Sequence, residues 1–187
     1  SYASQIITFT FPHIGNVGTN FEDIESESGP KIKGAIFNSP ITSPSNWRSK
    51  KNLNQWLIDN KITALYGVDT RSITTHIREK GFMNGIIVND QNGFKESESH
   101  KNKLSKWEGI VGQDLAKIVS TKEIYNWTER EESFLSDKIQ SINKHIVVID
   151  YGVKNNILRC LAARLNNISI VPCDTISEKI FSLKPDG

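Results

Sequence analysis

The residue types that support covalent catalysis are few in this chain of 187 residues. A nucleophile needs a base within hydrogen-bonding distance and a third group that orients the base. The candidates are two cysteines and four histidines: Cys160, Cys173, His13, His76, His100 and His145. Their spacing pairs no histidine with a cysteine or serine, which predicts structural or surface roles for the histidines. Cys160 lies in a helical apolar pattern and Cys173 follows a strand pattern, which favours packing roles for both.

Three polar segments could bind a ligand or act on one, and each has a simpler structural interpretation. The loop Gly15–Gly18 lacks the spacing and the following helix of a phosphate-binding loop, which favours a plain turn. The acidic stretch Glu22–Glu27 could hold a hard cation, but it lacks the ligand spacing of a calcium loop, so a solvated face is the alternative. Asp69-Thr70-Arg71 could be catalytic, although a capped helix start with a surface arginine also explains it. No metal site is predicted.

The composition is that of a soluble globular protein. Lys and Arg (23) exceed Asp and Glu (21) by two, for a net charge of +2, and 37% of the residues are hydrophobic. The basic residues are scattered, so no nucleic-acid partner is predicted. No apolar run approaches the roughly 20 residues that span a bilayer, and no leader pattern is present, so we expect no membrane partner and a cytoplasmic location. Two cysteines are too few for a disulfide framework or a four-ligand zinc site.

Apolar periodicity predicts alternating strands and helices in the first part of the chain. The expected strands lie at residues 6–11, 35–37, 64–68 and 85–88. A short amphipathic helix is expected around residues 53–57, and a longer one from Asp69 or Thr70 to a stop at Gly81. The polar stretch 89–106 is expected to be a loop or a weak helix.

The second part of the chain has a different pattern. Polar and charged residues dominate 129–143, which predicts a linker and a domain boundary. The apolar run 145–150 predicts a strand buried on both faces of a parallel sheet. A helix over 155–165 and a strand over 168–171 complete a βαβ unit, and a second helix is expected over 177–183. We therefore expect the first part of a doubly wound sheet, with an unpaired strand edge.

Several segments along nearly the whole chain match one known family in the same order. They are Ser1-Tyr2, Gln5 to Asn20, Ser45-Asn46-Trp47-Arg48, Gly67-Val68-Asp69-Thr70-Arg71, Arg78-Glu79-Lys80-Gly81, Asn84-Gly85, Asp114-Leu115-Ala116, Asp150 to Arg159, and Lys184-Pro185-Asp186-Gly187. In these segments the chain resembles the small, glutamine-hydrolysing subunit of carbamoyl-phosphate synthetase. The resemblance is to an internal fragment, without the extreme N-terminus and most of the amidotransferase domain.

The resemblance implies an α/β fold in two domains. Residues 1–140, linker included, would form the family's N-terminal domain, a β/β/α layered fold. Residues 141–187 would begin a class I glutamine amidotransferase domain with a doubly wound parallel sheet. The family's catalytic cysteine, histidine and glutamate are expected beyond Gly187, so no catalytic residue is assigned here. Only Ser1 is carried over, because its hydroxyl is expected to help bind glutamine; the alternative is a frayed terminus.

The resemblance also implies an activity and a partner. The small subunit hydrolyses glutamine to glutamate and ammonia. The large subunit combines ammonia with bicarbonate and ATP to make carbamoyl phosphate for arginine and pyrimidine biosynthesis, so the whole enzyme is a ligase. ATP and magnesium are expected in the large subunit, and no cofactor is expected in this chain. Two alternatives stay open: a non-catalytic docking fragment, and an amidotransferase subunit of another synthetase.

Overall fold

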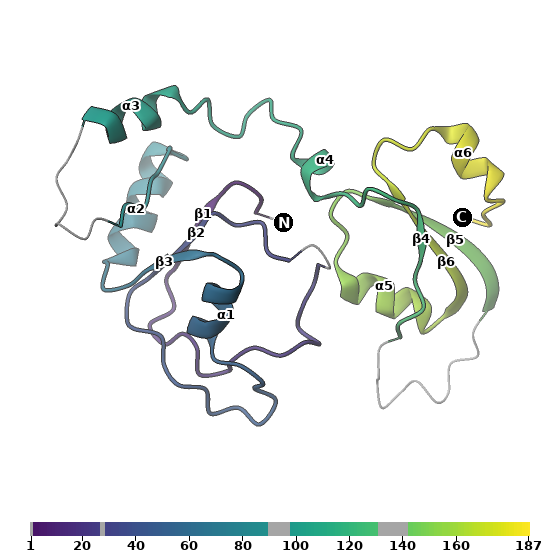
Figure 1. The fold of residues 1–187 in the computed structure, drawn as a ribbon, viewed down its shortest axis with the longest axis horizontal. Coiled ribbons are helices and arrows are strands. Elements are labelled where there is room, and N and C mark those ends of the chain that lie inside the picture. The colour runs from purple at the N-terminus through teal and green to yellow at the C-terminus, as the bar shows by residue number, and fades with distance from the viewer. Residues whose placement is uncertain (1, 27–28, 90–97, 131–141) are drawn as a thin grey trace. The chain divides into compact units, whose positions relative to one another are not determined.

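A computed structural model describes residues 2–26, 29–89, 98–130 and 142–187 (Figure 1). Contacts within the chain divide it into two compact units. The N-terminal unit comprises Tyr2–Asp23 and Pro30–Gln113, and the C-terminal unit contains Ile24–Gly29 and Asp114–Gly187. The segment Ile24–Gly29 therefore belongs to the C-terminal unit, although the residues before and after it in the sequence belong to the N-terminal unit.

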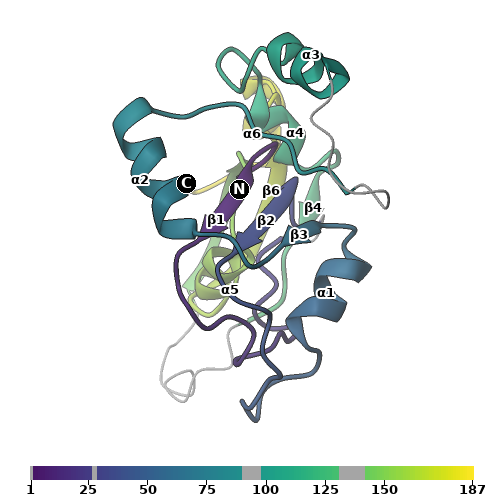
Figure 2. The same cartoon turned by 90° about the vertical axis from the view of Figure 1, so that its left-hand side faces the viewer.

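Three short parallel strands form the sheet of the N-terminal unit. They are β1 (Ile6–Phe9), β2 (Gly34–Phe37) and β3 (Thr63–Leu65), with β2 in the centre. Figure 2 shows the strands side by side, with helix α2 (Thr70–Lys80) beside β1 and helix α1 (Leu53–Asp59) beside β3. All three strands and both helices were expected from the sequence pattern, and their existence is confirmed.

The strands are shorter than the pattern predicts. β1 ends at Phe9 rather than at residue 11, and β3 ends at Leu65 rather than at residue 68. Gly67 has a φ of +79°, and its N–H donates to Asn38 O (3.2 Å) rather than to a neighbouring strand. The turn into α2 therefore begins where the apolar run suggested that the strand continues.

Apolar side chains from β2 and α1 form the core of the N-terminal unit. Its buried members are Ala35, Phe37, Leu57 and Ile62. Trp56, which is half-buried, packs against them from α1. The rings of Phe9 and Phe37 also pack together, with their centroids 5.2 Å apart. These contacts join β1, β2 and α1 into one compact layer of apolar side chains.

The strand expected at residues 85–88 does not form, and that prediction is wrong. Ile87 instead lies over Gly34, where a Cβ would approach Ile87 Cδ1 within 2.7 Å. The apolar run therefore packs a side chain on the sheet without pairing its backbone with a strand. In the following polar stretch, α3 (Glu98–Lys106) forms the helical alternative, and residues 90–97 lie outside the described residues.

The C-terminal unit is built on a second three-stranded sheet. In chain order its elements are α4 (Leu115–Val119), β4 (Tyr125–Asn126), β5 (Ile142–Asp150), α5 (Asn155–Ala162), β6 (Leu165–Pro172) and α6 (Ser177–Ser182). The strand order is β4-β6-β5; β5 and β6 are parallel, and β4 is antiparallel to β6. The predicted βαβ unit is confirmed as β5, α5 and β6. The antiparallel strand β4 is a feature that the sequence pattern did not predict.

The helix of the βαβ unit ends earlier than its apolar pattern suggests. Leu165 pairs with Ile142 in the parallel register, so it belongs to β6 and not to a helix over 155–165. The remaining helix packs on the sheet through its apolar face. The buried core of the unit consists of Trp127, Leu158, Ala162, Ile168 and Ile170.

β5 is less buried than its apolar run predicts. Ile146–Val148 are half-buried and Ile149 is exposed, because β5 lies at an edge of the three strands while β6 is central. The prediction of burial on both faces is therefore wrong for β5. Its outer edge is partly paired, since Asp186 N–H donates to His145 O (2.7 Å) and Val147 N–H donates to the carbonyl of the last residue (2.9 Å).

Both units combine helices with parallel strands, which confirms the α/β class. The β/β/α layers and the doubly wound amidotransferase sheet are finer descriptions and stay predictions. The family domain boundary after residue 140 also stays a prediction. By contacts within the chain, the second segment of the C-terminal unit begins at Asp114, and β4 within it pairs with β6.

Candidate functional site

The predicted ligand and nucleophile positions do not gather in one place. Ser1 lies outside the described residues. Cys160 lies in α5 and Cys173 directly follows β6, as the sequence predicts, and both are half-buried. His13 and His76 are exposed. None of these positions therefore supplies the site by itself.

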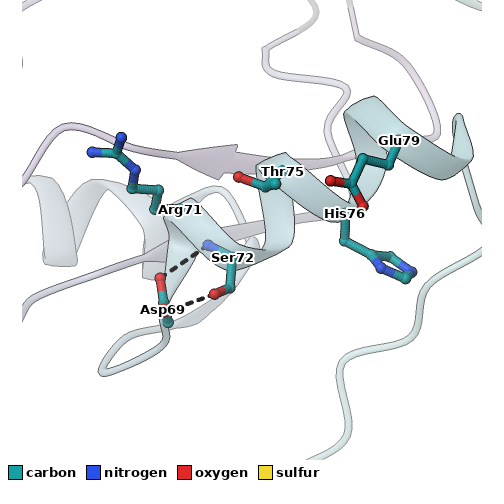
Figure 3. A pocket seen from close by; sticks show the side chains of 6 residues that line it. All are labelled: Asp69, Arg71, Ser72, Thr75, His76 and Glu79. Carbon is teal, nitrogen blue, oxygen red and sulfur yellow. Dashed lines mark hydrogen bonds between the residues drawn. The ribbon is translucent and has the colours of Figure 1, made fainter.

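A shallow hollow on the surface of α2 includes the Asp69-Thr70-Arg71 segment (Figure 3). Its lining is polar and exposed: Asp69, Arg71, Ser72, Thr75, His76 and Glu79. The Asp69 carboxylate accepts hydrogen bonds from the Ser72 N–H (3.0 Å) and hydroxyl (2.9 Å), and these bonds lower the pKa of Asp69. Figure 3 shows the Arg71 side chain on the opposite side of the hollow from His76. Asp69 is thus the helix cap, and the geometry favours the structural interpretation of this segment.

The first acidic residues of the stretch Glu22–Glu27 pair with an arginine. Arg48 Nη2 donates to Glu22 Oε2 (2.8 Å) and to Asp23 Oδ1 (3.3 Å). The hydrogen bond to Glu22, followed by the charge of Asp23, raises the pKa of Arg48. The side chains of Glu22 and Asp23 are 80% and 55% exposed, so this part of the stretch is a solvated face whose carboxylates pair with a guanidinium.

Glu25, from the same stretch, caps a helix far away in the sequence. Its Oε2 accepts the Asn156 N–H (2.9 Å) in the first turn of α5, and its backbone oxygen accepts the Asn155 N–H (3.2 Å). Lys154, which precedes the helix, makes no side-chain cap. A carboxylate there satisfies a free N–H and interacts favourably with the helix dipole. Glu25 therefore supplies the cap that the local sequence lacks.

The loop Gly15–Gly18 is a plain turn, as expected. Gly18 N–H donates to Gly15 O (2.9 Å), and both glycines have positive φ (+102° for Gly15 and +69° for Gly18). A Cβ on Gly15 would approach Ile41 Cγ2 within 2.6 Å. Because the turn packs this closely against residues 41–49, its backbone offers no open cradle for a phosphate group.

Asp150 lies at the carboxyl end of β5, and it is only 6% exposed. Its Oδ1 accepts the Gly152 N–H (2.8 Å) and the Val153 N–H (2.9 Å), which shapes the turn into α5. Its Oδ2 accepts the Thr121 N–H (2.6 Å). One buried carboxylate thus organises both the crossover turn and a segment that precedes β5 by more than twenty residues.

The segment Asp114–Thr121, which includes α4, crosses the carboxyl ends of the parallel strands β5 and β6. This segment is called the strap below. Its Ser120 Oγ accepts the Cys173 N–H (2.9 Å) just past β6, and the next residue, Thr121, is bonded to Asp150 at the end of β5 as described above. Val119 lies against Gly152, where a Cβ would approach Val119 Cγ2 within 2.8 Å. The strap is therefore attached to both strand ends.

A chain of polar side chains runs across the sheet on the face opposite α5. Ile168 and Ile170 pack toward the helix, so Ser169 between them faces the other way. Ser169 Oγ donates to Asn126 Oδ1 (2.9 Å) and lies 2.9 Å from His145 Nε2. The three side chains are linked by polar contacts across the strands, and this geometry favours a structural role for the group.

The carboxyl edge of β5 and β6 is the candidate functional site, because open parallel sheets bind ligands outside the carboxyl ends of their strands. Among the described residues, no three His, Cys, Asp or Glu side chains gather in a way that would hold a metal ion. Within the same ranges, no helix is long and apolar enough to cross a membrane. The edge instead offers fully bonded polar anchors that hold backbone segments in place.

Comparison with known proteins finds matches of one kind along the whole chain. A family model described as carbamoyl-phosphate synthase small chain, CPSase domain, matches residues 1–87. The carbamoyl phosphate synthase small chain of Bartonella quintana is 51% identical over 194 residues, which cover 100% of this chain and 48% of that protein. Those of Mesorhizobium japonicum and Rhizobium meliloti are 45% and 42% identical, with the same coverage. Over its whole length the chain is similar to carbamoyl phosphate synthase small chains. It spans about half the length of the curated relatives it matches.

These matches confirm the resemblance drawn from the sequence motifs, and they include the carboxyl edge because the relatives match both units. Neither Asp150 nor Ser120 was expected from the sequence to be a site residue. Asp150 had a usable signal, since an acidic residue between an apolar strand and a glycine is typical of a turn. No sequence signal near Ser120 indicates its role, because its partner Cys173 is 53 residues away.

Proposed function

We propose that the chain is part of the small subunit of a glutamine-hydrolysing carbamoyl-phosphate synthase. The observation that carries the proposal is the match of the whole chain to proteins named as small chains of that enzyme. In this role the small subunit releases ammonia from glutamine. A large subunit then combines ammonia with bicarbonate and ATP to make carbamoyl phosphate, in the cytoplasm, for arginine and pyrimidine biosynthesis.

The proposed hydrolysis proceeds through a thioester. A cysteine thiolate attacks the carboxamide carbon of the glutamine side chain, and backbone N–H groups hold the oxyanion of the tetrahedral intermediate. A histidine protonates the departing ammonia, and water then cleaves the thioester to release glutamate. The cysteine, the histidine and an orienting glutamate are predicted beyond Gly187. Cys160 and Cys173 are assigned no part in this chemistry.

The C-terminal unit supports a glutamine site at the carboxyl edge of its sheet. Its two parallel strands and crossover helix are the arrangement in which enzymes place ligands at the carboxyl ends of strands. Asp150 organises the backbone at this edge. From the other end of the chain, Ser1 is proposed to contact the substrate through its hydroxyl, which can both donate and accept a hydrogen bond.

Exposed aromatic side chains on the N-terminal unit support docking of a partner chain. Trp47 is 89% exposed and Phe82 is 95% exposed, and Phe21 is also exposed. The segments that carry Phe21 and Trp47 are joined by the hydrogen bonds of Arg48 to the acidic stretch. Aromatic residues and arginine are enriched at protein interfaces. The proposed partner is the large subunit, which would hold ATP and magnesium, so no cofactor is proposed for this chain.

The test of the function is product formation by the full-length protein together with its large subunit. Glutamine, bicarbonate and ATP are supplied, and glutamate and carbamoyl phosphate are measured. We expect both products, and we expect replacement of the nucleophilic cysteine to abolish glutamine use while synthesis from added ammonia continues. A different product would indicate another synthetase. Stable binding to the large subunit without glutamine hydrolysis would indicate a docking role.

The proposed role of Ser1 has a test of its own in the same assay. We expect Ser1→Ala to raise the KM for glutamine by about tenfold through the loss of one hydrogen bond, with little change in synthesis from ammonia. Ser1→Thr, which keeps a hydroxyl, is the matched control. An unchanged KM in Ser1→Ala would show that the residue does not contact the substrate.

A further inference from the structure

The strap is attached at two points, one at the end of each parallel strand. Thr121 N–H donates to Asp150 Oδ2 (2.6 Å) at β5, and Cys173 N–H donates to Ser120 Oγ (2.9 Å) after β6. Both Asp150 and Ser120 are buried. Hydrogen bonds in buried positions are costly to leave unmade, so each attachment is specific to the side chain that makes it.

Asp150 uses its two carboxylate oxygens for separate tasks. Oδ1 accepts both N–H groups of the crossover turn, from Gly152 and Val153, and Oδ2 accepts only the N–H of the strap residue Thr121. The strap bond can therefore be removed by a substitution that leaves one acceptor oxygen for the turn. Val119 adds a packing contact on Gly152, so the strap lies directly on the turn that Asp150 shapes.

The strap bonds are separate from the apolar core that holds the sheet together. That core consists of Trp127, Leu158, Ala162, Ile168 and Ile170. It packs α5 on one face of the sheet, whereas the strap crosses the strand ends. Release of the strap should therefore change the position of backbone at the carboxyl edge more than it changes whether the sheet folds.

We propose that Asp150 and Ser120 are positioning residues of the glutamine site, which hold the strap against the carboxyl ends of β5 and β6. The inference rests on the proposed function, because that function places glutamine hydrolysis at this edge. Neither side chain is assigned a contact with the substrate. They act through the strap and the crossover turn, and a misplacement of about 1 Å at such a site can lower the rate by roughly a hundredfold.

The test compares three variants of the full-length protein in complex with its large subunit. Asp150→Asn keeps an oxygen for the turn but directs its NH₂ group at the Thr121 N–H, so two donors face each other. Ser120→Ala removes the acceptor of the Cys173 N–H and leaves Asp150 unchanged. Thr121→Ala is the matched control, because it changes the side chain while keeping the backbone N–H that Asp150 binds. Three quantities are measured: kcat/KM for glutamine, the rate of carbamoyl phosphate synthesis from ammonia, and amide hydrogen exchange in residues 114–121.

We expect Asp150→Asn and Ser120→Ala each to lower kcat/KM for glutamine by about tenfold. Their synthesis from ammonia should be unchanged, and exchange in the strap should be faster. Thr121→Ala should stay within about twofold of the parent protein in all three measurements. A merely structural role would lower both activities together or neither. If Asp150→Asn does not fold, Ser120→Ala decides the question by the same criteria.

Two results would overturn the inference in distinguishable ways. Faster exchange in the strap with unchanged glutamine kinetics would show that the strap does not position the site, and the proposed function would stand. A parent complex that makes carbamoyl phosphate from ammonia but does not hydrolyse glutamine would refute the proposed function itself, and this inference with it.

Discussion

The two sheets close the carboxyl ends of their parallel strands in different ways. In the N-terminal unit, the backbone of the next connection returns to the end of β2, where Gly67 N–H donates to Asn38 O (3.2 Å). The side-chain bonds there, from Asn38 Nδ2 to Val68 O (3.3 Å) and from Ser39 Oγ to Asn38 Oδ1 (3.1 Å), are exposed. In the C-terminal unit, buried Asp150 and Ser120 make the closing bonds with their side chains. Hydrogen bonds between backbone groups can form with many residue types at these positions, whereas the side-chain hydrogen bonds require Asp150 and Ser120.

The central strands of the two sheets, β2 and β6, also differ in whether apolar packing or side-chain hydrogen bonds hold their faces. β2 is held by an apolar cluster that includes Phe37. β6 has an apolar face toward α5, but on its other face Ser169 bonds to Asn126 and is paired with His145. Directed hydrogen bonds specify one arrangement of the strands, whereas apolar packing tolerates rearrangement. The C-terminal sheet, which carries the candidate site, is thus the more precisely specified of the two.

The largest expected effects come from the apolar cores, where the two units should behave alike. We expect Phe37→Ala to lower the free energy of unfolding of the N-terminal unit by about 4 kcal/mol, and Leu158→Ala that of the C-terminal unit by about 3 kcal/mol. Both side chains are almost completely buried. Hydrogen exchange under native conditions reports the loss unit by unit. A cost below about 1 kcal/mol in either unit would mean that its core is not packed as described.

Replacement of a serine in or just after the central strand should destabilise the C-terminal unit more than the N-terminal unit. Ser169→Ala leaves the His145 and Asn126 side chains without a shared partner, and we expect the C-terminal unit to lose about 1.5 kcal/mol in urea unfolding. Ser39→Ala, at the carboxyl end of β2, is the matched change in the N-terminal unit, since the Ser39 hydroxyl donates only to exposed Asn38 (3.1 Å). It should cost less than about 0.5 kcal/mol. Equal losses in the two variants would contradict the difference drawn between the sheets.

The cap on α5 is expected to have a smaller effect. Glu25→Ala removes the acceptor of the Asn156 N–H, and we expect a loss of about 1 kcal/mol, together with faster exchange in the first turn of α5. Glu25→Gln keeps an oxygen but loses the charge, so it should lose about half as much. Exposed Glu123→Gln is the control for a change of net charge. If all three variants matched the parent protein, Glu25 would not be the cap.

The smallest expected effect is a dependence of stability on pH. A hydrogen bond from Lys144, followed by one from the His145 N–H (2.8 Å), lowers the pKa of Asp186. A group whose pKa is lowered by folding stabilises the protein above its unfolded pKa, about 3.9, and loses this contribution as the pH falls through the folded value. We expect urea midpoints of the C-terminal unit to fall between pH 7 and pH 3, and less so in Asp186→Asn. The same slope in the variant would show that Asp186 is not a source of the effect.

Much of the element order could be predicted from short-range patterns. The apolar runs located β1, β2, β5 and β6, and an acidic residue before an amphipathic pattern predicted the start of α2 at Asp69. The strand predicted at 85–88 failed because an apolar run records burial and not backbone pairing, and Ile87 is used to cover Gly34. β4 could not be predicted because its two residues are too few to show the apolar–polar alternation of a strand.

The amino-acid sequence by itself determined the apolar faces, the cap of α2 and the similarity to carbamoyl phosphate synthase small chains, since these depend on residues a few positions apart or on residue identity along the chain. Only the tertiary structure decided the partners of Asp150, Glu25 and Ser169. Asp150 bonds to a residue 29 positions away, Glu25 to one 131 positions away, and Ser169 to one 43 positions away. The physical reason is that a hydrogen bond forms only within about 3 Å and along a narrow direction, so it depends on how folding brings distant segments together.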